Sequence, residues 1–372
     1  MSCKYETHLL RAATHRRLAM GLGVIAATER PLRGRLDPSY SLSNQREKPM
    51  RKLMTIAVMA TAFAVATHAR AADKVRLTYT VQLHQANMMV LPELARKYGV
   101  ELEMVPMRRY ADQQLALMTN QVDVAQMGYV NIGLMEEKNF RDYRVIAGVF
   151  TGGQNLTLAK DIKATTWKDL EGHKLGSPPN SYSELIFKAS ARLGGADLSK
   201  IPLVSFAAGG PPMLSALKTR EIDGFVCWEP NNSEAAVGGY GVYSSLSIAD
   251  NPTRGINGML TVNSSFLQSH RPQVVGVIRA LIDATNALNA DRERYVQVAA
   301  QGTGSSPEVA REAIPHGVLD YKLYYKEAKA LLNLIYEAKL TQTDTSGAID
   351  RQYDYSLLSE AAGLPKTQLG AD

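Results

Sequence analysis

Two stretches of the chain repeat the same order of predicted elements, and this repetition restricts the fold more than any other feature. Residues 115–125 (LALMTNQVDVA) and 214–226 (LSALKTREIDGFV) each indicate a helix, a polar break and an Asp-led strand. Strands and helices also alternate around both stretches, which is typical of a parallel sheet covered by helices. The sequence therefore predicts two matching α/β units, and its 372 residues are enough for two domains.

The expected elements follow from runs of β-branched residues and from helical spacing of apolar residues. In the first unit we expect strands at 74–81, 100–105 and 121–127, and helices at 92–98 and 112–120. In the second unit we expect strands at 175–177, 201–207 and 224–228, and helices at 182–193 and 212–220. Two β-rich runs within 144–160 join the units, and a return strand at 259–262 precedes long helices that begin at Pro272 and Pro307.

The segment before the first unit has the features of a secretory signal peptide. Met50-Arg51-Lys52 is followed by the uncharged run 53–66 and by the small-x-small ending Ala69-Arg70-Ala71. The run is too short to span a bilayer, which needs about 20 apolar residues. We therefore expect residues 50–71 to be a signal peptide cleaved after Ala71, and residues 1–49 to be a mis-annotated or disordered extension. No Cys follows the run, so we expect a soluble periplasmic protein without a lipid anchor.

The charge of the chain is concentrated in this leader. The formal net charge is +6, but residues 72–372 carry 30 Lys and Arg against 32 Asp and Glu. A mature part without a net basic field lacks the main means of binding phosphate backbones. The sequence therefore argues against a nucleic-acid partner.

Motifs for covalent chemistry or for a cofactor are not evident. Cys3 and Cys227 are too few for a thiolate metal site or a disulfide framework. The GxGxxA pattern at 21–26 lacks the surrounding βαβ unit that a dinucleotide site needs. The sequence has no GxxxxGK[ST], HExxH, GxSxG or CxxC motif. We therefore expect no metal, no cofactor and no enzymatic activity.

Three motifs of the second unit carry a family resemblance. They are Leu170-Glu171-Gly172-His173-Lys174-Leu175-Gly176, Glu221-Ile222-Asp223-Gly224 and Trp228-Glu229-Pro230, within segments 168–187 and 207–230. In this order the elements resemble the periplasmic solute-binding proteins of ABC importers for nitrate, sulfonates, taurine and bicarbonate. The resemblance covers roughly residues 73–340. The family also includes binders and synthases of thiamine pyrimidine precursors, although the Cys-rich motif of the synthases is absent here.

The resemblance implies a two-lobed periplasmic-binding-protein-like fold (type II), each lobe a mainly parallel sheet covered by helices. Lobe 1 would comprise residues 73–153 and 252–372, and lobe 2 residues 154–251. Gly152 and Gly153 would form the hinge, because glycine permits the backbone angles that a hinge must adopt. A ligand would bind in the cleft, and an ABC permease with its ATPase would be the downstream partner.

The cleft residues can be predicted from the strand order, because ligands of open parallel sheets bind beyond the carboxyl ends of the strands. The loops at those ends supply the candidates, which in lobe 1 are Gln82, His84, Asn87, Arg108, Arg109, Tyr110, Tyr129 and Asn131. In lobe 2 they are Ser177, Asn180, Ser181, Tyr182, Gly210, Trp228 and Glu229.

These candidates have different expected roles. The hydroxyl and N–H groups of 177–183 would bind an anion at a helix N-terminus, although simple helix capping explains them too. Arg108 or Arg109 would clamp an oxyanion, and the sequence does not decide which of them faces the cleft. Tyr129 and Trp228 would stack on a planar ligand or pack in the core. Glu229 would repel a bare anion but accept an amino or hydroxyl group, unless it serves the turn.

We therefore expect an ABC-importer binding protein that captures a small organic anion, such as a sulfonate or a carboxylate, by cleft closure. Taurine-like, nitrate-like and aromatic carboxylate ligands are all compatible with the sequence. The alternative is a pyrimidine-precursor binder or a synthase-like enzyme on the same fold.

Overall fold

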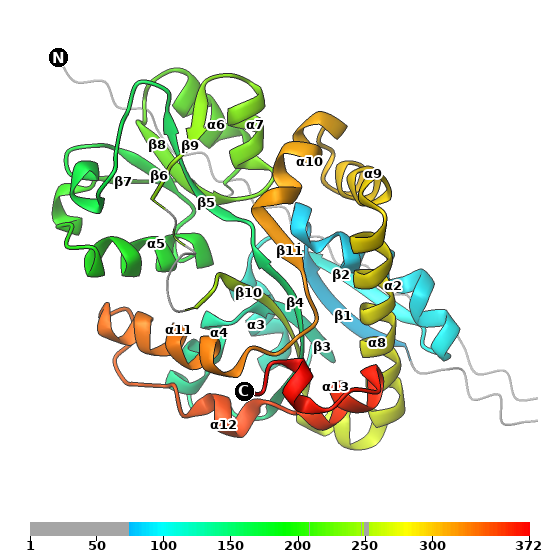
Figure 1. Cartoon of the computed structure of the whole chain (residues 1–372). Coiled ribbons are helices and arrows are strands. Elements are labelled where there is room, and N and C mark those ends of the chain that lie inside the picture. The colour runs from blue at the N-terminus through cyan, green and yellow to red at the C-terminus, as the bar shows by residue number, and fades with distance from the viewer. Residues whose placement is uncertain (1–73, 208, 247, 249–252) are drawn as a thin grey trace, which may run out of the picture. The chain divides into compact units, whose positions relative to one another are not determined.

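The computed structural model describes residues 74–207, 209–246, 248 and 253–372, all within one compact unit. The expected signal peptide and the extension at 1–49 lie outside the described residues. The described chain forms two α/β lobes, one around each of two sheets (Figure 1). The predicted fold class is confirmed.

Lobe 1 is built on a six-stranded sheet in the order β11-β4-β10-β3-β1-β2. Its strands are β1 (Val75–Thr80), β2 (Leu102–Met107), β3 (Val124–Gly128), β4 (Tyr143–Gly152), β10 (Ile256–Asn263) and β11 (Gly317–Leu319). Strands β1, β2 and β3 are parallel, whereas the return strand β10 pairs antiparallel with both β3 and β4. The carboxyl ends of β1, β2 and β3 therefore meet at one edge of this sheet.

Lobe 2 is built on a five-stranded sheet in the order β7-β6-β8-β5-β9. Its strands are β5 (Gln154–Ala159), β6 (Leu175–Ser177), β7 (Leu203–Ser205), β8 (Gly224–Trp228) and β9 (Gly241–Tyr243). Strand β6 is parallel to β7 and β8, and β5 is antiparallel to β8 and β9. The loops after β6 and β8 thus repeat the placement of the loops after β1, β2 and β3.

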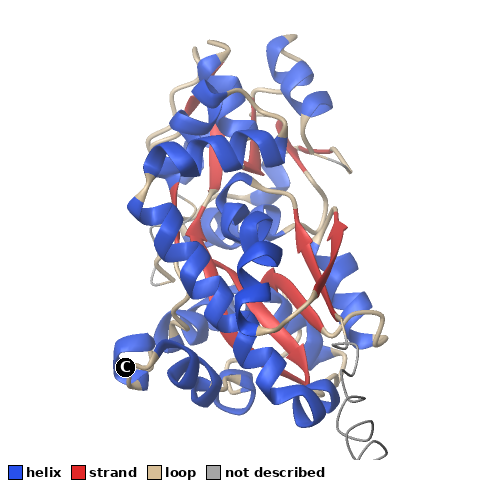
Figure 2. Cartoon of the chain, turned by 90° about the vertical axis from the view of Figure 1, so that its right-hand side faces the viewer, coloured by secondary structure: helices blue, strands red, loops and turns tan. Residues whose placement is uncertain are grey.

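Helices enclose both sheets (Figure 2), because strands with buried side chains on both faces need cover on both faces. Lobe 2 carries α5 (Tyr182–Leu193), α6 (Pro211–Lys218) and α7 (Asn231–Val237). The remaining helices are α2 (Ala86–Ala95), α3 (Tyr110–Met118), α4 (Val130–Glu137), α8 (Ser264–Ala290), α9 (Arg292–Thr303), α10 (Pro307–Ala313), α11 (Tyr325–Glu337), α12 (Ala348–Gln352) and α13 (Tyr355–Ala362).

Helix ends differ most from the sequence expectations. The helix expected at 92–98 begins earlier, as α2, and contains Pro92. The helix expected from Pro272 begins at Ser264 behind an Asn263 cap, and its backbone leaves helical angles at His270, just before the proline. The cap expected before Pro307 is confirmed, since the Ser306 hydroxyl accepts a hydrogen bond from the Val309 N–H at 3.2 Å.

The chain passes from β4 of lobe 1 to β5 of lobe 2 through Gly152 and Gly153. Both have positive φ angles, +70° and +72°, in the left-handed region that favours glycine. The Gly153 N–H donates to the carbonyl of His316 at 2.7 Å. A Cβ on Gly153 would lie 2.6 Å from Nδ1 of His84. The second crossing includes residues 249–252, so the lobe boundary at 251/252 lies outside the described residues and stays a prediction.

We predict that Gly153→Ala destabilises the protein more than Gly304→Ala. Gly304 has a similar φ of +73°, but a Cβ there would meet nothing within 4 Å. The control should therefore show the backbone cost alone, about 1–2 kcal/mol. Gly153→Ala should lower the free energy of unfolding by about 1–3 kcal/mol more than the control, because its methyl group overlaps His84. Urea unfolding of both variants measures the difference, and equal losses would show that the contact with His84 carries no cost.

Candidate ligand-binding site

A pocket of about 720 Å³, which includes the open solvent at its mouth, lies between the two lobes. Its walls come from the loops and helix starts that follow strands β1, β2, β3 and β6, from the first residue of β5 and from the last residue of β8. The predicted residues that line it are Gln82, Arg108, Arg109, Tyr110, Asn131, Asn180, Ser181, Tyr182 and Trp228. Their contact with a ligand stays a prediction, but the structure does bring them together around one space.

The remaining lining residues are Ala111, Val130, Leu134, Gln154, Pro179 and Leu185, which the sequence analysis missed. They lie within a few residues of strand ends, but most are apolar, and apolar residues at such positions are usually core. A search for the first helical turn after each strand end, without regard to polarity, would have found most of them. Their presence gives the pocket a mostly apolar wall with a few polar groups, as is common in small-molecule sites.

Two buried tyrosines, one from each lobe, line the pocket. Tyr110 of lobe 1 and Tyr182 of lobe 2 meet edge to face with 6.5 Å between ring centroids. The Tyr182 hydroxyl donates a hydrogen bond to the carbonyl of Ile256 in lobe 1. Gly128 leaves room for this contact, since a Cβ there would lie 2.7 Å from the Tyr182 ring. Burial raises the pKa of both phenols, so they act here as neutral groups.

The two arginines at the pocket are not equivalent. Arg109 binds Asp112 through two hydrogen bonds of 3.2 and 2.8 Å, and this partner raises the pKa of its guanidinium. The Arg108 side chain has no hydrogen bond or ion pair anywhere in the described part of the chain. Both arginines line the pocket, so their orientation does not distinguish them. They differ in whether the guanidinium already has a carboxylate partner. Arg108 is the one whose guanidinium is available to a ligand.

Helices α3 and α4 both begin at the pocket wall. Neither has a side-chain cap, and Ala111, Val130 and Asn131 lie in their first turns. The first N–H groups of a helix have no acceptor within it, and they carry a partial positive charge. Asn131 donates through Nδ2 to Gln114 at 2.7 Å. Lobe 1 therefore presents two helix N-termini without side-chain caps at the pocket that Arg108 also lines.

The N-terminus of α5 is different, because a carboxylate of the helix itself occupies it. Glu184 accepts hydrogen bonds from the Asn180 N–H at 3.0 Å and the Ser177 hydroxyl at 3.2 Å, and it pairs with Lys188. Ser181 accepts from the Glu184 N–H at 3.2 Å. The carboxylate of Glu184 therefore occupies the position at 177–183 where we expected a ligand anion. The Ser-x-x-Glu spacing of Ser181 and Glu184, typical of a helix start, was the signal in the sequence.

Six predicted site residues lie outside the pocket lining: His84, Asn87, Tyr129, Ser177, Gly210 and Glu229. His84 is buried next to Phe150, and its Nε2 lies 3.4 Å from the Ile314 carbonyl. Asn87 donates to the Val149 carbonyl at 3.0 Å and to Thr285 at 3.1 Å. The polarity of these side chains serves internal hydrogen bonds, so we leave them out of the proposed site.

Tyr129, Ser177 and Gly210 are left out for related reasons. Tyr129 is buried at the start of α4, and burial raises the pKa of its phenol well above the usual value. Ser177 is buried and bonded to Glu184. Gly210 is the residue before α6, and its φ of +64° lies in a region that glycine adopts readily. We therefore assign it a role in the turn that starts this helix. Of the stacking candidates, Trp228 alone lines the pocket.

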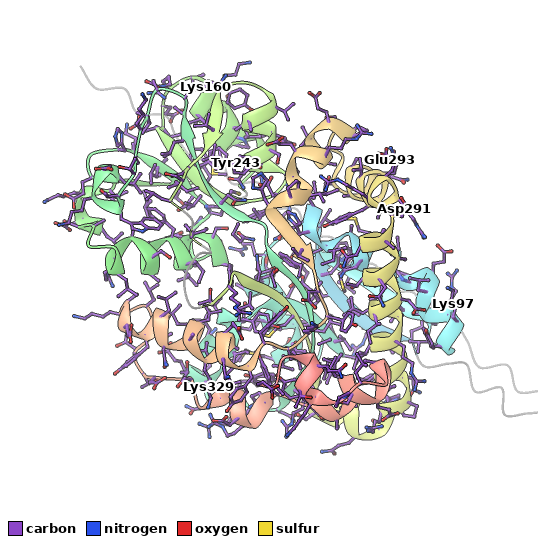
Figure 3. All side chains as sticks on the ribbon, in the orientation of Figure 1. Lys97, Lys160, Tyr243, Asp291, Glu293 and Lys329 are labelled. Carbon is purple, nitrogen blue, oxygen red and sulfur yellow. The ribbon has the colours of Figure 1, made fainter. Side chains whose placement is uncertain are left out.

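Glu229 belongs to a buried polar cluster behind the pocket. Its carboxylate accepts hydrogen bonds from Asn155 at 3.0 Å, the Ser233 N–H at 3.0 Å and the Tyr243 hydroxyl at 2.8 Å. Burial raises its pKa to about 7 in spite of these donors. Tyr243, labelled in Figure 3, also stacks on His316 of lobe 1 with 3.8 Å between centroids. The cluster therefore helps to join the lobes beside Gly153.

Comparison with known proteins assigns the chain to a family. A model of the NMT1-like family matches residues 68–301. The chain belongs to the NMT1-like family. No curated protein matches this family member in sequence.

The described residues contain no helix long and apolar enough to cross a membrane. They also contain no cluster of three or more His, Cys, Asp or Glu side chains that could hold a metal ion.

Solved structures with the same fold include two binding proteins and an enzyme. The alkanesulfonate-binding protein SsuA from Xanthomonas axonopodis pv. citri is 16% identical, with a TM-score of 0.63 over 77% of this chain and 99% of that one. The nitrate-binding protein NrtA from Synechocystis PCC 6803 is 14% identical, with a TM-score of 0.66 over 82% and 93%. The desulfurization enzyme DSZB is 15% identical, with a TM-score of 0.57 over 78% and 99%.

We predict that Glu229→Gln makes stability less dependent on pH. Because folding raises the pKa of Glu229 from 4.5 to about 7, the group favours the folded state below pH 4.5, and this contribution is lost as the pH rises through 7. The loss amounts to about 3 kcal/mol. The unfolding free energy of the variant minus that of the wild type should therefore rise by up to about that amount between pH 4.5 and 8.

Urea unfolding at pH 4.5, 6 and 8 measures this difference. Glu293→Gln is the control, because Glu293 is exposed and its hydrogen bonds to Gln297 and Arg311 lower its pKa. The control should show no such rise. A constant difference for Glu229→Gln would mean that this carboxyl group titrates normally in the folded protein.

Proposed function

We propose that this protein is the periplasmic binding component of an ABC importer, which captures a small organic anion between its lobes and delivers it to a permease and ATPase complex. Family membership and the shared fold of sulfonate- and nitrate-binding proteins support this role. Closure would move the lobes about Gly152 and Gly153. The closed form would be the one that the permease recognises.

The observation that carries the proposal is the exposed guanidinium of Arg108, which has no partner among the described residues and lines a pocket between the lobes. A charged donor without a partner in a partly enclosed pocket favours an anionic ligand, because a charge-assisted hydrogen bond is stronger than a neutral one. The mostly apolar walls formed by Tyr110, Tyr182, Leu185 and Trp228 favour an organic ligand over a fully hydrated ion.

The alternative is a pyrimidine-precursor binder or a synthase-like enzyme, and the shared fold of the desulfurization enzyme gives it specific support. An enzyme of this kind would need an activated group at the pocket. Cys227 does not fit that role, because it is not among the residues that line the pocket and burial raises the pKa of its thiol to about 12. Mass spectrometry of the ligand after incubation separates the two proposals: the binding protein returns it unchanged, and an enzyme does not.

We predict that Arg108→Gln weakens the binding of benzenesulfonate by about 10- to 100-fold, since a hydrogen bond to a charged group contributes about 1.5–3 kcal/mol. Isothermal titration calorimetry measures the affinity. Arg109→Gln should have a several-fold smaller effect, because Asp112 already engages that side chain. Arg311→Gln, which removes an exposed arginine of α10, is the matched control and should leave affinity unchanged. A wild-type protein that binds neutral pyrimidines and no organic anion would overturn the proposal.

A further inference from the structure

We propose that lobe 1 alone holds the oxyanion of the ligand, through Arg108 and the first-turn N–H groups of α3 and α4, whereas lobe 2 binds only the apolar body. The site would then be selective for a monoanionic acid with an apolar body. This inference rests on the proposed function and specifies its ligand class.

Among the residues that line the pocket, the charged side chain without a partner, Arg108, belongs to lobe 1. Helices α3 and α4 of lobe 1 begin at the pocket without side-chain caps, and Arg108 lies next to the start of α3. Gln82 gives independent support: it is 5% exposed and lines the pocket, and its side-chain amide has no hydrogen-bond partner in the described ranges. The amide atoms of this mostly buried side chain keep contact with solvent at the pocket, so they are open to a polar ligand group.

The lobe 2 residues that line the pocket carry no charge, and their polar groups, on Asn180, Ser181 and Trp228, are neutral. The one helix N-terminus of lobe 2 at the pocket, that of α5, already holds the carboxylate of Glu184. The Ser183 hydroxyl there donates to Gln154, so it too is engaged. The remaining lobe 2 surface at the pocket is formed largely by Pro179, Tyr182, Leu185 and Trp228. A second negative charge on this side would find no cation among the lining residues.

This asymmetry restricts the ligand in three ways. A dianion whose second charge faces lobe 2 would find no cation among the lining residues there, and Glu184, which does not line the pocket and is paired with Lys188, adds a weak repulsion. An inorganic oxyanion would leave the apolar surface of lobe 2 without a partner. A zwitterion would place its ammonium group in a pocket whose lining contains no carboxylate. An acid with one charge and an apolar body satisfies both sides.

A binding panel with the full-length wild-type chain tests the inference. Benzenesulfonate, benzoate and hexanesulfonate should bind at least about tenfold more tightly than nitrate, taurine or 1,3-benzenedisulfonate in calorimetric titrations. The ratio between benzenesulfonate and benzoate decides whether the site prefers a sulfonate or a carboxylate head. Equal or tighter binding of nitrate, taurine or the disulfonate would overturn the inference while the proposed function stands. Binding of none of these anions would overturn both.

Substitutions in each lobe test the division of roles. Leu185→Ala should weaken hexanesulfonate about tenfold and leave methanesulfonate within about twofold, because it removes apolar contact from the body alone. Arg108→Gln should weaken both ligands by a similar factor. A Leu185→Ala variant that weakens both equally would show that lobe 2 also contacts the head group, and the inference would fail.

Glu184→Gln tests the exclusion of a second charge. We expect a few-fold tighter binding of 1,3-benzenedisulfonate, with benzenesulfonate changed less. Glu293→Gln on α9 is the control and should change neither affinity. Unchanged rejection of the disulfonate by a folded Glu184→Gln variant would contradict the role of Glu184. Should this variant unfold, the ligand panel and the Leu185→Ala comparison still decide the inference.

Discussion

The site depends on one contact between the lobes, in which Tyr182 of lobe 2 packs against Gly128 and Tyr110 of lobe 1 and donates to the Ile256 carbonyl. This contact sets the start of α5 opposite the starts of α3 and α4. Residue 128 must be small, because even one methyl group there would overlap the Tyr182 ring. The three helix starts, which belong to different lobes, surround one pocket as a result.

The electrostatics of these helix starts then determine what the pocket can hold. Every helix N-terminus has N–H groups without an acceptor, so each must find a cap, a carboxylate, water or a ligand. Helix α5 uses its own Glu184, whereas α3 and α4 have no side-chain cap and begin beside the unpaired Arg108. The positive end of the pocket therefore belongs to lobe 1, and lobe 2 contributes mainly surface that excludes water.

Much of this organisation could be predicted from the sequence. The repeated helix-break-strand pattern gave the two lobes, and the rule that ligands bind beyond strand ends found Arg108, Tyr182 and Trp228 together. The same rule also selected His84 and Glu229, because polarity after a strand end does not reveal which way a side chain points. In the structure both side chains are buried: His84 stacks on Phe150, and Glu229 accepts a hydrogen bond from Tyr243. The pairing of Arg109 with Asp112 likewise became evident once the start of α3 was fixed.

The central claim is that the two lobes close around a ligand without changing it, and a distance between the lobes tests this most directly. Leu193 on α5 and Leu115 on α3 are both exposed, and α3 packs on the sheet of lobe 1. With Cys3 replaced and Cys227 buried, Leu193→Cys and Leu115→Cys can carry a pair of spin labels. Pulsed dipolar spectroscopy should show longer, broader distances in the free protein and one shorter distance, matching this structure, with saturating benzenesulfonate. An identical distribution with and without the bound ligand would contradict the account.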